Sequence, residues 1–448
     1  MMRRLFFFAI AAVVLLSACQ DNDSFSNDRG LRLTFAVDTV KMDTMFSTVP
    51  SATYNFWVYN KSGNGIRIST VRLERGNQSG FRVNVDGTFL DPVANELEVR
   101  KDDSIRVFVE VTPPEAYTTD PKLIEDNLLF TLESGVEQRV NLRTWSWDAE
   151  KLMKLVVTRD TVIESSKPVV VYGDSIRIKK GATLTLRNTN LYFHDQTGIA
   201  VEGRLIAENC LMRGDRLDHM FDYLPYDRVS GQWSGIKVYP DASCEMTGCE
   251  IRNPFDGMMC FANSKVTLVN TVIHNCRGYG FHAEDAVVSL SYCQLSNTYG
   301  DCLSLQGCQA VVDHCTLAQF YLLSSTRGAA INFGDTEKPL SLTCTNTLMT
   351  GYNEDVLVGM KPSETVQYVF DNCLIRTPKI DNEETFKNII WETPEDEFEG
   401  TDHFLLVDDK NLIYDFTIKE ESPAYAPGIG RAFVQKEDQE TEQQQPSE

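Results

Sequence analysis

The sequence predicts an all-β protein in which a β-sandwich precedes a parallel β-helix solenoid of about eight coils. The first observation is a pair of apolar residues around one variable residue, which recurs at steps of 22, 23 and 22 residues. These pairs are Ile236/Val238, Met258/Cys260, Phe281/Ala283 and Leu303/Leu305. A fixed step in this range is typical of a solenoid whose repeats stack on one another. The second observation is a set of seven short segments between residues 31 and 146 that alternate apolar and polar residues, as sandwich strands do.

Like residues return at equivalent positions of each repeat. A small residue follows the second apolar pair at Cys249, Thr271, Cys293 and Cys315, and an asparagine follows it at Asn253, Asn275 and Asn297. Because stacked strands lie about 4.8 Å apart, each repeated position becomes a column along the solenoid. The asparagine column can therefore hydrogen-bond its amides from coil to coil.

The repeat extends in both directions over residues 168–431. Further coils open at Ile176/Ile178, Ile199/Val201, Ile331/Phe333 and Val356/Val358. Each segment alternates at period 2 over three to five residues, which predicts short strands with no intervening helix. The stretch Glu421–Gly428 contains Ser-Pro-Ala followed by a glycine four positions later.

These features resemble the right-handed parallel β-helix proteins of the pectin-lyase-like superfamily, including the SPAxxxG turn that closes many of them. The resemblance covers residues 168–431 and implies the fold much more strongly than a chemistry, because one fold hosts many functions.

The sandwich of residues 31–146 is expected to be a separate domain. Its segments Trp57–Gly63 and Val109–Pro113 resemble the Ig-like, PapD/hydin-type modules of bacterial surface proteins, which implies a stalk or an interaction module. Residues 147–167 are expected to form a linker and an N-terminal cap for the solenoid, since solenoids need capped ends.

The N-terminus predicts export. Two arginines precede the apolar run Leu5–Leu16 and the small residues before Cys19, which indicates a signal peptide over residues 1–18. The run is shorter than the ~20 apolar residues of a transmembrane helix. Leu16–Cys19 resembles a bacterial lipobox, which implies lipidation of Cys19; the alternative is an ordinary signal peptide with a chance cysteine.

The residues after Cys19 bear on location. Gln20–Asp23 resembles the surface-export signal of Bacteroidetes lipoproteins, which implies an outer-membrane anchor facing the exterior; a plain solvated linker is the alternative. Residues 19–30 are expected to be a flexible tether, and the Glu/Gln-rich residues 432–448 a disordered acidic tail.

Charge and cysteine content exclude several partners. The formal net charge is −22 over 448 residues, which argues against nucleic acid and anionic lipid as partners. Eleven cysteines follow Cys19, and their inward positions predict buried free thiols in preference to a disulfide framework. None of the cysteines has zinc spacing, so no metal site and no cofactor are expected.

The superfamily resemblance directs attention to Asp313-His314, which resembles a pectate-lyase segment whose aspartate helps to bind Ca2+. The half matches Arg252-Asn253-Pro254 and Arg376-Thr377-Pro378 lack the second arginine of the lyase motif. Asp313 and His314 are therefore weak catalytic candidates, and the favoured interpretation is a turn pair. Ca2+ is expected only if the protein is a lyase.

An insertion between the second and third coils, from Arg213 to Gly235, is the most irregular segment. Insertions on solenoids emerge as loops, often on the binding face. Its mixture of aromatic and charged residues predicts ligand contacts at Arg216, Asp218, Tyr223, Tyr226 and Trp233. The alternative is that the insertion folds flat over the coil edges, with Trp233 anchoring its return.

Two functions remain open. One is an outer-membrane lipoprotein whose solenoid binds a polysaccharide or an envelope protein, and the other is a polysaccharide lyase or glycoside hydrolase. The sequence favours binding over catalysis, because packing explains the scaffold while no catalytic set is complete.

Overall fold

A computed structural model describes residues 24–118, 120–221 and 223–431. The chain divides into two compact units, Met1–Asp148 and Ala149–Glu448, and each is described by itself. The predicted signal peptide, Cys19 and the acidic tail lie outside the described residues. Within the described ranges, no helix is long and apolar enough to cross a membrane.

The first unit is a sandwich of two five-stranded sheets. One sheet has the order β1 (Thr34–Phe35), β3 (Tyr54–Tyr59), β8 (Ser104–Val111), β5 (Phe81–Val85) and β6 (Thr88–Phe89). The other has the order β2 (Thr39–Phe46), β10 (Glu137–Trp147), β9 (Lys122–Leu132), β4 (Ile66–Leu73) and β7 (Val93–Val99). All pairs are antiparallel except β2 with β10, and the inward side chains form one hydrophobic core.

The sandwich differs from the prediction in two respects. Strands β2, β6 and β7 were not predicted; all three lie at a sheet edge, and β7 buries only Ala94 and Val99, so its alternation is weak. Residues 24–30, predicted as part of a flexible tether, are attached to the sandwich. The Ser26 amide donates to the Gly65 carbonyl at 3.1 Å, and the Arg67 guanidinium lies 4.5 Å from the centre of the Phe25 ring.

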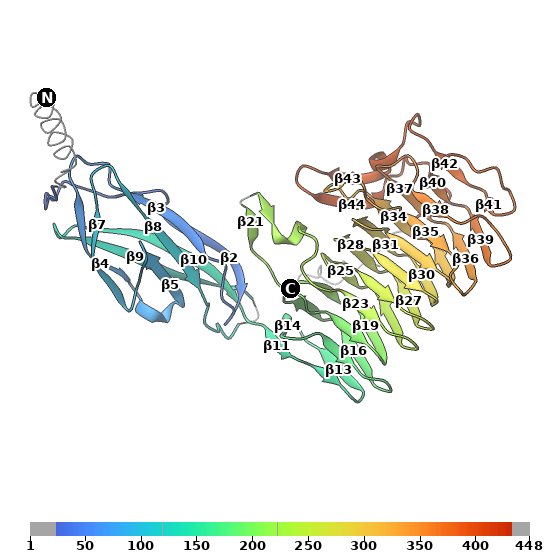
Figure 1. Cartoon of the computed structure of the whole chain (residues 1–448), viewed down its shortest axis with the longest axis horizontal. Coiled ribbons are helices and arrows are strands. Elements are labelled where there is room, and N and C mark those ends of the chain that lie inside the picture. The colour runs from blue at the N-terminus through green and yellow to red at the C-terminus, as the bar shows by residue number, and fades with distance from the viewer. Residues whose placement is uncertain (1–23, 119, 222, 432–448) are drawn as a thin grey trace, which may run out of the picture. The chain divides into compact units, whose positions relative to one another are not determined.

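The second unit is a solenoid of three parallel sheets that run along its length (Figure 1). The eleven-stranded sheet contains β11 (Glu150–Met153), β14 (Val169–Tyr172), β17 (Asn190–Phe193), β20 (Leu211–Gly214), β25 (Glu250–Arg252), β28 (Val272–Cys276), β31 (Gln294–Thr298), β34 (Thr316–Gln319), β37 (Leu348–Gly351), β40 (Leu374–Arg376) and β42 (Ile390–Glu392).

The nine-stranded sheet contains β12 (Val156–Val157), β15 (Ile176–Ile178), β18 (Ile199–Val201), β23 (Ile236–Val238), β26 (Met258–Cys260), β29 (Phe281–Glu284), β32 (Leu303–Gln306), β35 (Ile331–Gly334) and β38 (Leu357–Gly359). The ten-stranded sheet contains β13 (Thr161–Glu164), β16 (Thr183–Arg187), β19 (Arg204–Glu208), β24 (Ser243–Thr247), β27 (Lys265–Val269), β30 (Val287–Ser291), β33 (Gln309–Asp313), β36 (Leu340–Thr345), β39 (Val366–Asp371) and β41 (Phe386–Lys387). The predicted fold class is confirmed.

The ends of the solenoid differ from the predicted boundaries. Strands β11 to β13 pair with the first predicted coil, so part of the segment predicted as linker and cap is solenoid. The prediction that Val356 and Val358 form an inward pair is wrong for Val358. In β38, Leu357 and Gly359 pair with Ile331 and Phe333, while Val358 is 51% exposed. A Cβ on Gly359 would lie 2.2 Å from the Phe333 ring, so this large ring requires a glycine beside it.

The small-residue column is fully buried and hydrogen-bonded. Each member donates to the carbonyl two residues earlier, over 2.6–3.4 Å, at Thr189, Cys210, Cys249, Thr271, Cys293, Cys315, Thr347 and Cys373. The column therefore takes small side chains that carry a donor. All eleven described cysteines are buried free thiols.

A C-terminal arm, residues 400–431, covers the outer face of the eleven-stranded sheet. It begins with the 3₁₀ helix η3 (Gly400–His403), continues through the antiparallel hairpin of β43 (Phe404–Asp408) and β44 (Ile413–Ile418), and ends in the SPAxxxG turn. Its side chains Phe404, Phe416, Ala424 and Ile429 pack on the outward Ala318, Leu348 and Leu374. The stacked coils thus end at β42, and the rest of the predicted solenoid is this arm.

A buried polar network holds the arm. Glu392 accepts hydrogen bonds from the Arg376 guanidinium at 2.5 Å and the Gly400 amide at 2.6 Å. Burial would raise the pKa of Glu392, but hydrogen bonds from His403, Gly400 and Arg376 outweigh it and lower that pKa. Oγ of Ser422, from the SPAxxxG turn, lies 2.8 Å from His403 Nδ1, which ties the turn to the network.

Candidate functional site

Three irregular segments meet over the outer face of the eleven-stranded sheet. They are the insertion, the loop after β34 and the tip of the β43–β44 hairpin. Together they enclose a cavity of about 310 Å³, here called the sheet cleft. Its lining residues are Asp227, Arg228, Glu250, Arg252, Val272, His274, Asn275, Gln294, Asn297, Tyr321, Leu322, Leu323, Leu412, Ile413 and Tyr414.

The floor of the sheet cleft consists of outward residues from β25, β28 and β31. In each strand the inward residue, Ile251, Ile273 or Leu295, belongs to the solenoid core. Period-2 alternation therefore turns the flanking residues, such as Arg252 and His274, to the outer face. The sequence interpretation missed these floor residues, although a polar residue directly after the core residue recurs at Arg252, His274 and Ser296 and could have indicated them.

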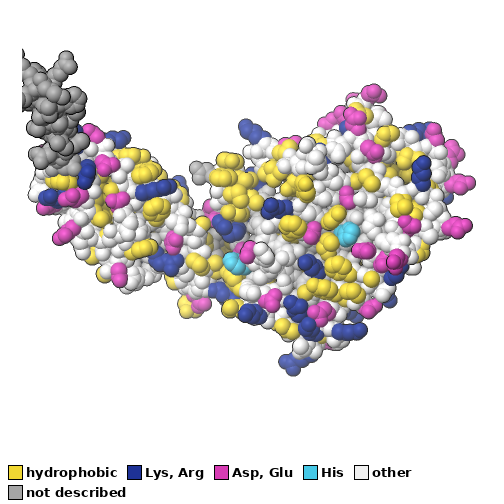
Figure 2. All heavy atoms as spheres, in the orientation of Figure 1, with side chains coloured by type: hydrophobic (Ala, Val, Ile, Leu, Met, Phe, Trp, Pro, Cys, Tyr) yellow, Lys and Arg dark blue, Asp and Glu magenta, His cyan; other side chains and the backbone are white. Residues whose placement is uncertain are grey.

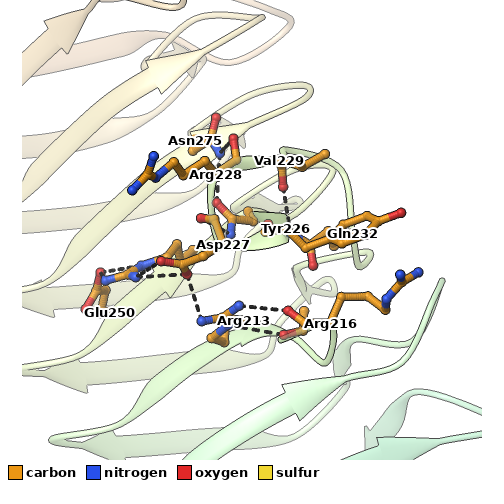
Figure 3. A network of polar contacts seen from close by, with 12 residues as sticks. Arg213, Arg216, Tyr226, Asp227, Arg228, Val229, Gln232, Glu250 and Asn275 are labelled. Atoms are coloured by element: carbon orange, nitrogen blue, oxygen red, sulfur yellow. Dashed lines mark hydrogen bonds and ion pairs between the residues drawn. The ribbon is translucent and has the colours of Figure 1, made fainter. Parts of the chain in front are cut away.

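Asp227 is the centre of an ion-pair network on one wall (Figure 3). Its carboxylate lies 2.7 Å from Arg213 Nη1 and 3.1 Å from Arg252 Nη1. Arg252 also donates from Nη2 to Glu250 at 2.5 Å. Burial alone would lower the pKa of Arg252, but Glu250 and Asp227 outweigh it and raise that pKa. The two carboxylates of the cleft are thus both paired with arginine.

His274 stands neutral on the floor. Burial, with a further effect of Arg252, lowers the pKa of His274 to about 4. Its Nδ1 lies 2.9 Å from the Ser296 hydroxyl, and its ring is 5.8 Å from that of Tyr414, on the hairpin. The hairpin is joined to the insertion through Arg228, whose Nη1 donates to the Asn411 carbonyl at 2.6 Å.

The predicted asparagine ladder forms only in part. Asn275 donates to Asn253 Oδ1 at 2.8 Å, and Asn253 donates to the Asp227 carbonyl at 2.8 Å. Asn297 is the next member of the column and is 3% exposed. Its Oδ1 is buried without a hydrogen-bond partner among the described residues.

None of the five ligand contacts predicted in the insertion lines the sheet cleft. Arg216 forms two hydrogen bonds with Asp218, at 2.6 and 2.5 Å, and its guanidinium lies 3.9 Å from the centre of the Tyr226 ring. These three side chains therefore satisfy one another. Tyr223 is 78% exposed and stacks on Phe221 with ring centres 5.7 Å apart.

Trp233 requires a correction. It is 1% exposed, stacks on Phe193 at 4.3 Å and 7°, and donates from Nε1 to the Arg252 carbonyl at 2.9 Å. No face of its ring is open to a ligand. It anchors the return of the insertion to the core, as the alternative interpretation proposed.

Asp313 and His314 lie at a coil corner. His314 has a φ of +47°, in the left-handed region that corner residues of this solenoid share, and stacks on Tyr292 at 4.9 Å. Asp313 accepts hydrogen bonds from Thr345 at 2.6 Å and Asn346 at 2.8 Å. The pair therefore forms part of the turn. Among the described residues, no group of three or more His, Cys, Asp or Glu side chains could hold a metal ion.

A chain of Ser422, His403 and Glu392 has the residue types of a nucleophilic triad. His403 Nε2 lies 3.2 Å from Glu392, completing the chain. However, all three side chains are at most 3% exposed, so a substrate cannot reach them. Surface charge does not mark a site either, because acidic and basic side chains are interspersed over the face of the solenoid in Figure 2.

Residues 155–317 match the family model of the right-handed beta helix region. No curated protein matches the chain. The first solved structure found is a family 123 glycoside hydrolase from Clostridium perfringens, with 7% identity, 27% of this chain and 26% of that chain covered, and a TM-score of 0.19. The chain thus spans about a quarter of that protein's length.

Two further structures each resemble a part or most of the chain. The seventh PapD-like domain of human CEP192 shares 10% identity over 27% of this chain and 88% of that one, with a TM-score of 0.18. The catalytic unit of a GH87 α-1,3-glucanase from Streptomyces thermodiastaticus shares 9% identity over 76% and 89%, with a TM-score of 0.16. These likenesses are too low to bear on function. The family match and the parallel sheets identify the second unit as a right-handed parallel β-helix that follows an antiparallel β domain.

Proposed function

We propose that the protein is a glycan-binding lipoprotein of the outer membrane and that the sheet cleft is its binding site. The observation that carries the proposal is the convergence of three irregular segments on one cavity. The cavity combines aromatic residues, side-chain amides and charged groups, the mixture that small-ligand sites use for contact area and orientation. Its volume of about 310 Å³ is at the small end of ligand pockets, suited to one or two sugar rings.

A polysaccharide hydrolase is the second candidate, because Asp227 and Glu250 line the same cavity. Glycoside hydrolysis uses two carboxyl groups, one of which must hold a proton at the working pH. Both carboxylates here are held in ion pairs with Arg252, so neither stands free as the acid or base of such a pair would. Binding therefore ranks ahead of hydrolysis.

Affinity electrophoresis of the mature protein in gels that contain single polysaccharides, with and without Ca2+, tests the proposal. Leu323→Asp places a charge on an exposed rim residue of the cleft and should abolish retardation. Leu405→Asp makes the same change at a residue with similar exposure outside the cleft and should not. Equal behaviour of the two variants, or retardation by no polymer, contradicts the proposal, and loss of polymer favours the hydrolase.

The membrane anchor is tested separately. Cys19→Ala should release the protein from the membrane fraction, and protease treatment of intact cells should remove the wild-type protein if it faces the exterior. A protein that stays in the membrane fraction after Cys19→Ala would contradict lipid anchoring.

A further inference from the structure

We infer that the sheet cleft recognises an uncharged, hydroxyl-rich saccharide and that Asn297 is a specificity-determining residue for it. This inference rests on the proposed function and adds the class of ligand. It follows from which polar groups around the cavity are already satisfied and which are open.

Asn297 carries an acceptor that has no hydrogen-bond partner among the described residues. Its two predecessors in the column use their amides within the fold, whereas its Oδ1 is buried without a partner among the described residues. A buried acceptor without a donor carries a desolvation cost. On the next coil, Gln319 cannot continue the ladder because its Nε2 donates to the Gly300 carbonyl at 2.9 Å. A ligand hydroxyl that reached Asn297 would supply the donor that the fold omits.

Arg252 and Arg213 are, by contrast, already paired within the protein. Arg252 donates from Nε and Nη2 to Glu250 and from Nη1 to Asp227. Arg213 donates from Nε to the Gly214 carbonyl and from Nη2 to the Arg216 carbonyl, and pairs with Asp227 through Nη1. A carboxylate on the ligand would have to displace protein carboxylates that already hold these guanidinium groups.

Arg228 is the remaining cation of the lining. It donates to the Asn411 carbonyl, and no carboxylate among the described residues lies within ion-pair distance of it. Arg228 and Arg252 together balance Asp227 and Glu250, so the lining residues carry as many negative as positive charges. His274 adds no charge at neutral pH. The cleft thus offers side-chain amides and a neutral imidazole, which suit hydroxyl groups. Among the described lining residues, Arg228 is the one cation with which a carboxylated sugar would have to pair.

The test compares four soluble neutral polysaccharides with derivatives in which the C6 hydroxyl is oxidised to a carboxylate. The probes are pullulan, galactomannan, mixed-linkage β-glucan and arabinogalactan, with alginate as a naturally charged polymer. Affinity electrophoresis of the full-length mature protein gives the dissociation constants. At least one neutral polymer should bind, and its oxidised derivative should bind at least tenfold more weakly.

Asn297→Gly removes the amide and keeps the backbone, because Asn297 has a φ of +53°, which glycine adopts readily. It should weaken binding of the neutral polymer about three- to tenfold, as loss of one hydrogen bond does. Asn209→Gly is the matched control, since Asn209 also has a φ of +53° but lies at a coil corner away from the cleft. It should leave binding unchanged.

Four results would overturn the inference. In the first, oxidised polymers bind as tightly as neutral ones and lose binding with Arg228→Ala. In the second, the Asn297→Gly variant binds the neutral polymer as tightly as the wild type does. In both cases Leu323→Asp would still abolish binding, and the proposed function would stand. Retention by alginate alone would also leave the function intact and overturn the ligand class, whereas retention by no polymer would end both.

Discussion

Replacing Trp233 with alanine should destabilise the solenoid strongly without any ligand being involved. The indole is 1% exposed, stacks on Phe193 and hydrogen-bonds the Arg252 carbonyl. A buried tryptophan removes about 150–250 Å² from water, worth roughly 4–6 kcal/mol at about 25 cal/mol per Å². Alanine recovers part of this area, so the expected loss of unfolding free energy is about 3–5 kcal/mol, the range of large-to-small core substitutions.

Urea unfolding followed by far-ultraviolet circular dichroism measures the loss, and hydrogen exchange over residues 223–235 locates it. Trp233→Phe keeps a stacked ring and loses only the Nε1 hydrogen bond, so about 1–3 kcal/mol should be lost. Tyr223→Ala, in the same insertion but 78% exposed, should change stability by less than about 0.5 kcal/mol. A Trp233→Ala variant within about 1 kcal/mol of wild type would refute the reasoning.

Three further predictions concern the solenoid unit. Glu392→Gln should cost about 3–5 kcal/mol of unfolding free energy, because it leaves the buried Arg376 and His403 without their shared carboxylate, whereas Glu208→Gln at an exposed pair with Arg187 should cost about 0.5 kcal/mol or less in the same urea titration. The protein should lose stability as the pH falls from about 6.5 to 4, because His274 takes up a proton in the unfolded chain and stays neutral in the folded chain. The effect is at most about 3.5 kcal/mol, from 2.5 pKa units at about 1.4 kcal/mol each, and His274→Gln should remove it from the pH profile of stability. Deleting residues 400–448 should keep the parallel-strand circular dichroism but cause self-association in sedimentation, because Leu348 and Leu374 become exposed; a monomeric product would contradict the role given to the arm.

The sequence predicts the solenoid well because coil stacking places like residues in columns, as the 22-residue spacing of Cys249, Thr271, Cys293 and Cys315 illustrates. It predicts the sheet cleft poorly, because the walls of the cleft are joined by contacts such as that between Arg228 and Asn411, which lie 183 positions apart. Periodicity describes only neighbouring coils. The composition of the insertion indicated a segment that contributes Asp227 and Arg228 to the cleft, but it named none of the lining residues and could not show that Trp233 turns inward.

The arm also has a consequence for the order of folding. In a solenoid each coil contacts only its neighbours, so folding can begin at any coil and spread to the coils beside it. The arm departs from this rule, since the Arg431 amide donates to Thr316 Oγ1 at 2.9 Å and its guanidinium donates to Asn270 Oδ1 at 2.9 Å, across 115 and 161 positions of the chain. The arm can close so long a loop only onto coils that have already formed. Because the hairpin of the arm is also a wall of the sheet cleft, the cleft is complete only when the arm has docked, and a chain interrupted before residue 400 would form stacked coils but no cleft.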